Sequence, residues 1–254
     1  MLKMSGHSKP SFDGFSLLEM AVVLVIVSIM MGGLLVTLSQ TQEINSRNDA
    51  ERDLDEIASA LYGFAQATGR LPCPATATSN GLESPVGGST TGSGCDQQHG
   101  FVPSATLGLS GTVNAAGLFM DPWLSPYRYT VSTANNPGNN NAYTSPNGIS
   151  AATMTTLVNA TDSLRVCDAA ACGVVIADAL AAVIMSLGAD WASFTAADVD
   201  ATENSGEVTV NGYRHGNDVN FVDTGYIEDV FDDLIIWISP SILFTKMISA
   251  GQLP

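Results

Sequence analysis

Hydrophobic residues dominate one long stretch near the start of the chain. Residues 15–38 are almost all apolar and contain a single charged side chain, Glu19. A helix needs about 20 such residues to cross the hydrocarbon core of a bilayer. The stretch therefore predicts a membrane-spanning helix. Its one carboxylate lies near the start of the stretch. An ionised side chain at the centre of a membrane helix costs about 2.5–3.5 kcal/mol, so a carboxylate in such a segment usually needs a partner.

The same helix is expected to continue beyond the apolar stretch. Residues 39–52 are polar on all sides. Apolar residues then recur at intervals of three and four, which indicates one buried helical face. These positions are Leu54, Ile57, Ala58, Leu61, Phe64 and Ala65. Gly69 and Pro72 end the pattern, so it predicts one helix over residues 15–67, about 80 Å long at 1.5 Å per residue.

Strand patterns follow in the remainder of the chain. The residue pattern over 127–131 alternates with the period of two that is typical of a strand. The apolar run 234–239 predicts a central strand. Residues 208–214 contain an Asn-Gly pair, which favours a tight turn, between two segments with strand-like alternation. This pattern predicts a hairpin. The segments 76–100 and 132–150 are rich in turn residues and are expected to form loops.

Two helices are predicted in the part of the chain that follows the long helix, residues 69–254, which is called the head below. Residues 179–187 place apolar side chains on one helical face before Gly188. Ser239 and Pro240 fit an N-cap followed by proline in the first turn, with the helix stopping near Gly251. The predicted fold class is α+β. A long N-terminal helix, half membrane-embedded and half amphipathic, packs on a globular head with an antiparallel sheet and additional helices.

Composition narrows the function classes. The chain has 25 acidic and 9 basic residues, a formal net charge of −16. Such a surface repels nucleic-acid phosphates, and no nucleic-acid partner is expected. An enzymatic function is disfavoured as well. The head has only two histidines as candidate catalytic bases, His99 and His215, and it has no recognisable nucleophile, metalloprotease or phosphate-binding motif.

Four cysteines, Cys73, Cys95, Cys167 and Cys172, all lie beyond the apolar stretch. Four cysteines allow three pairings. The local pairs 73–95 and 167–172 each close a loop and are favoured in an oxidising compartment. Zinc binding is the alternative, although neither pair has Cys-x-x-Cys spacing.

Gly14 and Phe15 stand directly at the boundary between polar and apolar sequence, four residues before Glu19. A secretory signal has a shorter apolar region and a small-residue cleavage site after it, which this stretch lacks. A generic single-pass anchor leaves the combination of Gly14, Phe15 and Glu19 unexplained. The pattern resembles the prepilin leader of type IV pilins and type II secretion pseudopilins, and the resemblance extends over residues 1–54.

The resemblance implies a processing pathway. A prepilin peptidase would cut between Gly14 and Phe15 and N-methylate Phe15. The removed leader carries Lys3 and Lys9, whose positive charge favours the cytoplasmic side. In an assembled filament Glu19 would pair with the Phe15 amine of a neighbouring subunit, which sets the axial register.

A second resemblance lies in the head. Asp121-Pro-Trp-Leu-Ser-Pro-Tyr127 is similar to the turn that precedes a strand in major pseudopilins. Pro122 and Pro126 fix φ, and Asp121 can cap the turn. We expect Trp123 and Tyr127 to pack under the sheet, a structural role.

Acidic residues gather late in the sequence: Asp218, Asp223, Glu228, Asp229, Asp232 and Asp233. Carboxylate oxygens suit Ca²⁺, and the family resemblance implies a calcium-binding C-terminal loop. A solvated acidic face is the simpler interpretation. Apart from this Ca²⁺, no cofactor is expected.

These observations predict a structural subunit of a type IV pilus-like or type II secretion-like filament, and they favour a minor over a major subunit. The expected parts are the leader 1–14, the membrane helix 15–38, the amphipathic helix 39–68 and a periplasmic head 69–254. Expected partners are prepilin peptidase, other pilin subunits, an inner-membrane assembly platform and the membrane itself. A pilus-borne adhesin or receptor and a membrane-anchored periplasmic enzyme are the alternatives.

Overall fold

The computed structural model describes residues 16–89, 94–133, 141–152, 163–192, 200, 203–204, 219–226 and 231–253, without the side chains of 31–40. The chain divides into two compact units, Met1–Asn45 and Ser46–Pro254. Helix α1 (Leu17–Thr68) contains the boundary between them. Its bounds agree with the helix predicted over 15–67.

In the N-terminal unit, α1 exposes large apolar side chains that include Leu17, Leu18 and Leu24. Within the part of the chain that the structure describes, no helix is long and apolar enough to cross a membrane.

In the unit Ser46–Pro254, one face of α1 is buried in the head, as its periodicity predicts. Ala50, Leu54, Ile57, Leu61 and Ala65 are at most 3% exposed and belong to the main hydrophobic core. Spacings of three and four residues place them on one stripe of the helix. The core therefore has the last turns of α1 as one of its walls.

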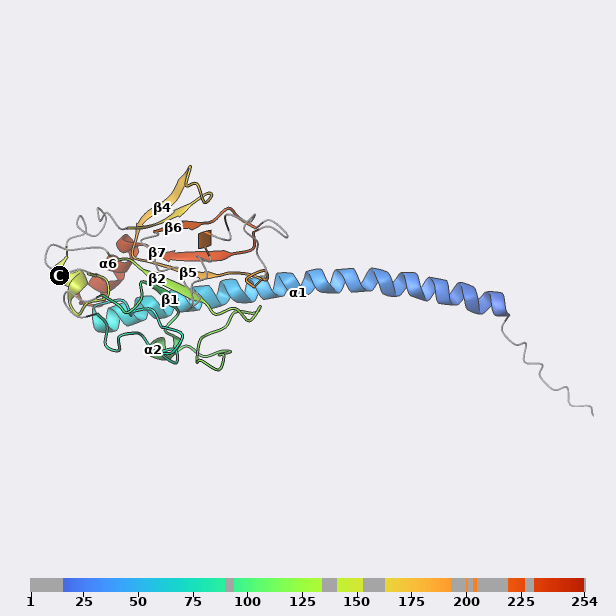
Figure 1. The fold of residues 1–254 in the computed structure, drawn as a ribbon, viewed down its shortest axis with the longest axis horizontal. Coiled ribbons are helices and arrows are strands. Elements are labelled where there is room, and N and C mark those ends of the chain that lie inside the picture. Colours follow the sequence, from blue (N-terminus) through green and yellow to red (C-terminus); the bar gives the residue numbers. More distant parts are fainter. Residues whose placement is uncertain are drawn as a thin grey trace, which may run out of the picture. The chain divides into compact units, whose positions relative to one another are not determined.

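A four-stranded antiparallel sheet packs on this stripe. Its strands are β1 (His99–Phe101), β2 (Arg128–Val131), β5 (Ala182–Ser186) and β7 (Leu234–Ile238), in the order β1-β2-β5-β7. In Figure 1, β2, β5 and β7 lie along one side of the later turns of α1, and the short helix α2 (Ser104–Leu107) lies on the other side.

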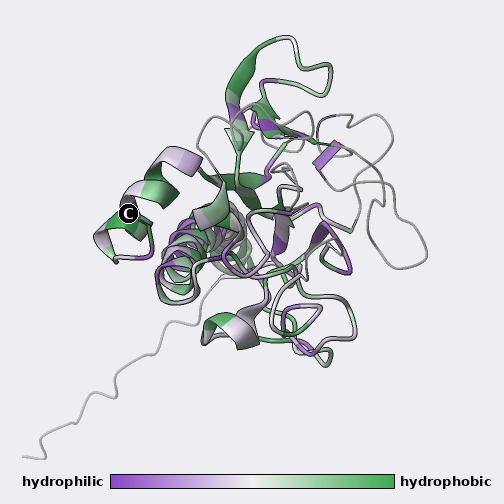
Figure 2. Ribbon diagram, turned by 90° about the vertical axis from the view of Figure 1, so that its left-hand side faces the viewer, coloured by the Kyte–Doolittle hydropathy of each residue, from purple (hydrophilic) through white to green (hydrophobic). Residues whose placement is uncertain are grey.

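A second, three-stranded sheet covers the other face of the first. It has the order β4-β3-β6, with β3 (Leu164–Cys167) antiparallel to β4 (Val175–Leu180) and parallel to β6 (Asn220–Val222). Val183 and Met185 of β5 meet Leu164, Val166 and Phe221 in a second core cluster. Figure 2, turned by 90°, again places β4 and α2 at opposite ends of the head.

The prediction of a helix at residues 179–187 is wrong. These residues form the end of β4 and all of β5. Ala182 and Ile184 face the core beside α1, whereas Val183 and Met185 face the second core. A strand buried on both faces gives a continuous apolar run, which periodicity cannot distinguish from a buried helix.

Other predictions have mixed outcomes. Strands near 127–131 and 234–239 are confirmed as β2 and β7. The C-terminal helix is confirmed as α6 (Pro240–Ser249), with Ser239 at the N-cap position and Pro240 in the first turn, but the Ser239 side chain makes no cap hydrogen bond. β7 is not central, because it ends the order of the described strands. The one-turn helix α3 (Gly148–Ala151) overlaps the end of the loop predicted at 132–150, and the predicted hairpin 208–214 lies outside the described residues.

Both local disulfides are present. Cys73–Cys95 joins residues 22 apart in sequence, and Cys167–Cys172 closes a loop of separation 5 beside the β3–β4 connection. Because these bonds use all four cysteines, a cysteine-bound zinc site does not fit this structure.

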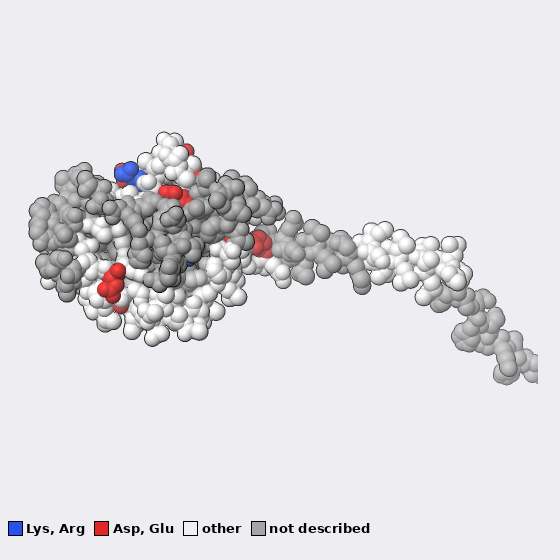
Figure 3. Space-filling view, in the orientation of Figure 1, with Lys and Arg blue, Asp and Glu red and all other residues white. Residues whose placement is uncertain are grey.

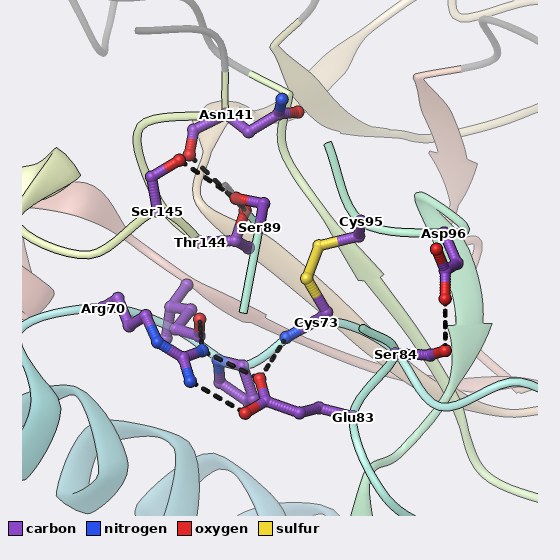
Figure 4. Close-up of a disulfide and its surroundings, with 12 residues drawn as sticks. Arg70, Cys73, Glu83, Ser84, Ser89, Cys95, Asp96, Asn141, Thr144 and Ser145 are labelled. Carbon is purple, nitrogen blue, oxygen red and sulfur yellow. Dashed lines mark hydrogen bonds and ion pairs between the residues drawn. A yellow bond between two sulfur atoms is a disulfide. The ribbon is translucent and has the colours of Figure 1, made fainter. Parts of the chain in front are cut away.

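A buried ion pair supports the larger disulfide loop directly after α1. The two guanidinium nitrogens of Arg70 donate to the two carboxylate oxygens of Glu83 at 2.8 and 2.7 Å. Glu83 also accepts from the backbone N–H of Cys73 at 3.1 Å, as Figure 4 shows beside the disulfide. Bidentate geometry and the extra N–H donor satisfy a pair of charges that would be costly to bury alone.

Candidate functional site

The first turn of α1 is closed by a reciprocal pair of hydrogen bonds between Ser16 and Glu19. The Glu19 backbone N–H donates to Ser16 Oγ at 3.1 Å, and the Ser16 backbone N–H donates to Glu19 Oε2 at 3.3 Å. This is a capping box, in which two otherwise unpaired N–H groups of the helix start are satisfied. Glu19 therefore lies in the first turn, where the helix dipole favours negative charge.

The capping box was not anticipated, although its signal is present in the sequence. Ser-x-x-Glu before an apolar run is the pattern of a helix start. The family resemblance implies only an intersubunit role for Glu19 and no role for Ser16. Gly14 and Phe15, the expected cleavage and methylation positions, lie outside the described residues.

A second candidate site is a group of three carboxylates in the head. Asp190, Asp232 and Asp233 place one ligand oxygen each within 4.8 Å of one another. Asp232 and Asp233 directly precede β7, and Asp190 follows β5 by a few residues. Since β5 and β7 are paired antiparallel, the end of one strand lies beside the start of the other.

Hydrogen bonds hold two of these carboxylates. Asn204 Nδ2 donates to Asp233 Oδ2 at 2.7 Å, and the Ala189 backbone N–H donates to Asp232 Oδ2 at 2.5 Å. Asp232 Oδ1 is buried and has no hydrogen-bond partner among the described groups. One carboxylate oxygen of the group thus retains its capacity to accept a ligand.

The electrostatics of the group oppose full ionisation. Asp233 is 4% exposed. Burial raises its pKa well above the usual value, and the charges of Asp232 and Asp190 raise it further, against a lowering by the Asn204 hydrogen bond. A bound divalent cation would remove this repulsion, and an all-oxygen donor set fits Ca²⁺.

Gly188 brings Asp232 close to the end of β5. Its φ is +65°, and a Cβ at this position would collide with the Asp232 carboxyl group. Glycine is required for both reasons: it adopts the left-handed conformation without strain, and it leaves room for the carboxylate.

A buried network connects this region to the turn predicted at Asp121. Ser186 Oγ donates to Asp121 Oδ2 at 2.5 Å, while the backbone N–H groups of Trp123 and Ser125 donate to Asp121 Oδ1 at 3.0 and 2.7 Å. Burial raises the pKa of Asp121 to about 6, with a further contribution from the charge of Asp232. The predicted capping role of Asp121 is confirmed.

The predicted acidic cluster is only partly assembled. Asp232 and Asp233 belong to the group, but Asp223 does not and instead accepts from the Gly225 N–H at 3.4 Å. Asp218, Glu228 and Asp229 lie outside the described residues. Asp190 was missed because only the pairing of β5 with β7 brings it near. Figure 3 shows acidic side chains at several separate places on one face of the molecule.

Comparison with known proteins is informative for the N-terminus. A model of the prokaryotic N-terminal methylation motif matches residues 10–35. No curated protein and no solved structure matches the chain. The matched segment contains Gly14 and Phe15 as well as Ser16 and Glu19 of the capping box. At residues 10–35 the chain therefore carries the prepilin-type cleavage and methylation segment of type IV pilins and pseudopilins.

Proposed function

We propose that this protein is a structural subunit of a type IV pilus-like or type II secretion-like filament. The methylation motif at residues 10–35 carries the proposal. A prepilin peptidase cuts between Gly14 and Phe15 and methylates Phe15. Residues 15–38 anchor the chain in the inner membrane, with the head in the periplasm, until an assembly platform transfers it to the filament.

Glu19 gives this proposal a physical mechanism. An ionised carboxylate in a membrane segment is costly unless it finds a partner. Cleavage after Gly14 would create a positive α-amino group at Phe15, adjacent in sequence to Ser16. In the filament the Phe15 amine of one subunit neutralises Glu19 of its neighbour, so that removing the helix from lipid also relieves an unpaired charge.

A minor, low-copy position is the form of this proposal that we favour. The head is large, which suits a sparse or terminal position sterically. Glu19 is retained, whereas the tip subunit of such filaments typically lacks this carboxylate. An adhesin or receptor subunit would share the anchor and differ only in what the head binds.

A structural role is preferred over catalysis. His99 Nδ1 lies 3.0 Å from Thr130 Oγ1, at the edge of the sheet. His99 is not a member of the carboxylate group. His215 lies outside the described residues.

Processing provides the direct test. The full chain is expressed in a host with prepilin peptidase, and its intact mass and N-terminal sequence are determined. We expect loss of residues 1–14 and one added methyl group on Phe15. A matched host without the peptidase should yield the uncut chain. Recovery of uncut chain from the peptidase-containing host would refute the proposal.

We also propose that Asp190, Asp232 and Asp233 bind Ca²⁺, which would connect the ends of β5 and β7. The close approach of three carboxylates and the unpartnered oxygen of Asp232 support this. Calcium should raise the melting temperature of the full chain in detergent, and Asp232→Asn should abolish the increase. Asp223→Asn is the matched control and should keep it. An equal calcium response in all three proteins would contradict the site.

A further inference from the structure

A groove lies between α1 and the start of β7. It has a volume of about 300 Å³ and is lined by Glu51, Leu54 and Asp55 from the helix and by Leu234, Ile235 and Ile236 from the strand. All six residues belong to the unit Ser46–Pro254, and the groove is separate from the processing segment and from the three-carboxylate group.

The strand residues show which part of β7 the groove contacts. Leu234, Ile235 and Ile236 are consecutive. Successive side chains of a strand point to opposite faces of the sheet, so a cavity lined by three in succession lies along the edge of the strand. Among the described strands, β7 pairs with β5 on one side and ends the sheet order. The groove thus lies at the edge of the sheet that no described strand covers.

The groove is apolar at its base and acidic at its rim. Leu54 and Leu234 are buried, and Ile235 and Ile236 are half-buried. Glu51 and Asp55 are exposed on the helix rim, one turn of α1 apart. Arg47 Nε lies 3.4 Å from Glu51 Oε1, and its guanidinium lies over the ring of Tyr226, 4.7 Å from the ring centroid. Because Glu51 is exposed, this ion pair contributes little, and a second cation can share the carboxylate.

We propose that this groove binds an extended peptide segment of a partner protein, with alternating apolar residues and at least one Lys or Arg. The peptide adds a strand to β7, as in β-augmentation, where backbone hydrogen bonds provide affinity and side-chain contacts provide specificity. Its apolar side chains contact Leu54 and Ile236, and its cation lies between Glu51 and Asp55. A second copy of this chain is a poor occupant because its net charge is −16.

Synthetic peptides test this directly. A set of eight-residue peptides alternates Val and Thr, with Lys introduced at each position in turn. Binding to the full chain in detergent is followed by fluorescence anisotropy, and backbone amides of β7 are followed by hydrogen exchange. We expect at least one peptide to bind and to slow exchange in β7. Its backbone N-methylated analogue, which cannot pair with a strand edge, should not bind.

Charge variants distinguish this groove from general acidity. The double variant Glu51→Gln/Asp55→Asn should weaken binding about fivefold, as expected for two surface charges worth about 1 kcal/mol together. Glu56→Gln removes an exposed charge of the same helix outside the groove and should leave binding unchanged.

Four results would overturn the proposal. The first is that no peptide of the set slows exchange in β7. The second is equal binding of the N-methylated analogue, and the third is equal loss of binding in Glu56→Gln and the double variant. The fourth is protection of the same amides by concentration-dependent self-association of the chain, which would identify a second copy as the occupant. None of these depends on whether the chain enters a filament.

Discussion

Asp121 organises a turn and a strand at the same time. Its two oxygens accept hydrogen bonds from two backbone N–H groups and from Ser186 of β5. The side chain is 2% exposed. Burial without a cationic partner among the named contacts explains why its pKa rises to about 6 although every hydrogen bond favours the charged form.

This pKa predicts a stability effect of definite sign. A folded-state pKa above the unfolded value means that the native state binds more protons between about pH 4 and 6, so stability falls as pH rises through this window. Asp121→Asn should remove part of the decrease. Asn can accept both N–H groups and donate to the Ser186 hydroxyl, which is able to accept.

The measurement is the free energy of unfolding of the full chain in detergent, from urea titrations at pH 4.5 and 7.5. The difference between the two pH values should be smaller for Asp121→Asn than for the wild type. Asp55→Asn, on the exposed side of α1, should retain the wild-type difference. If Asp121→Asn shows the full wild-type decrease, Asp121 does not titrate in this range.

At the scale of elements, the start of α1 combines two requirements. Ser16 and Glu19 cap the helix within one subunit. Under the proposed function the same carboxylate must also meet the amine of a neighbour. The capping bonds hold the Glu19 carboxylate against the start of the helix. Under the proposed function, the amine of the neighbouring subunit would meet the carboxylate at this helix end.

Substitutions at these two positions should separate the roles. Glu19→Val should leave membrane insertion and head folding intact, because it removes a costly charge from the lipid, but should strongly reduce incorporation into filaments. Ser16→Ala removes only the cap, worth about 1 kcal/mol, and should reduce incorporation less. The ratio of subunit in sheared filaments to subunit in membranes measures both effects.

Glu43→Gln, a change on α1 outside residues 15–38, serves as the control and should assemble normally. Wild-type incorporation of the Glu19→Val protein would show that the carboxylate is not the intersubunit contact. A larger defect in Ser16→Ala than in Glu19→Val would instead assign the main role to the cap.

For the whole molecule, the head is stabilised from two directions. The core beside α1 joins helix and four-stranded sheet, and the second core joins the two sheets. Because Ala50 to Ala65 of α1 contribute a wall of the first core, residues 69–254 alone would expose it. The disulfides then restrain two loops of different length, with sequence separations of 22 and 5 residues.

The two disulfides should contribute unequally. Closing a loop of 22 residues stabilises the fold by roughly 3 kcal/mol on the chain-entropy estimate, and closing one of 5 residues by roughly 2 kcal/mol. Cys73→Ser should therefore lower the melting temperature of the full chain more than Cys167→Ser. Non-reducing peptide mapping should recover the 73–95 and 167–172 peptides. An equal or inverted order of melting temperatures would contradict the estimate.

The sequence by itself determined those features that depend on residues near one another in the chain. The helical face of α1, the Asp121 turn, the start of α6 after Ser239 and the processing segment all have local signals, because capping, turn chemistry and periodicity act over a few residues. The cap at Ser16 was equally local and was overlooked.

Only the tertiary structure decided the rest. Residues 182–186 are a strand because both faces are covered, by α1 on one side and by β3 and β6 on the other. Asp190 joins Asp232 and Asp233 because β5 and β7 pair in antiparallel register. The groove at β7 exists because that strand ends the described sheet beside α1. Each depends on contacts between distant segments, which local patterns do not specify.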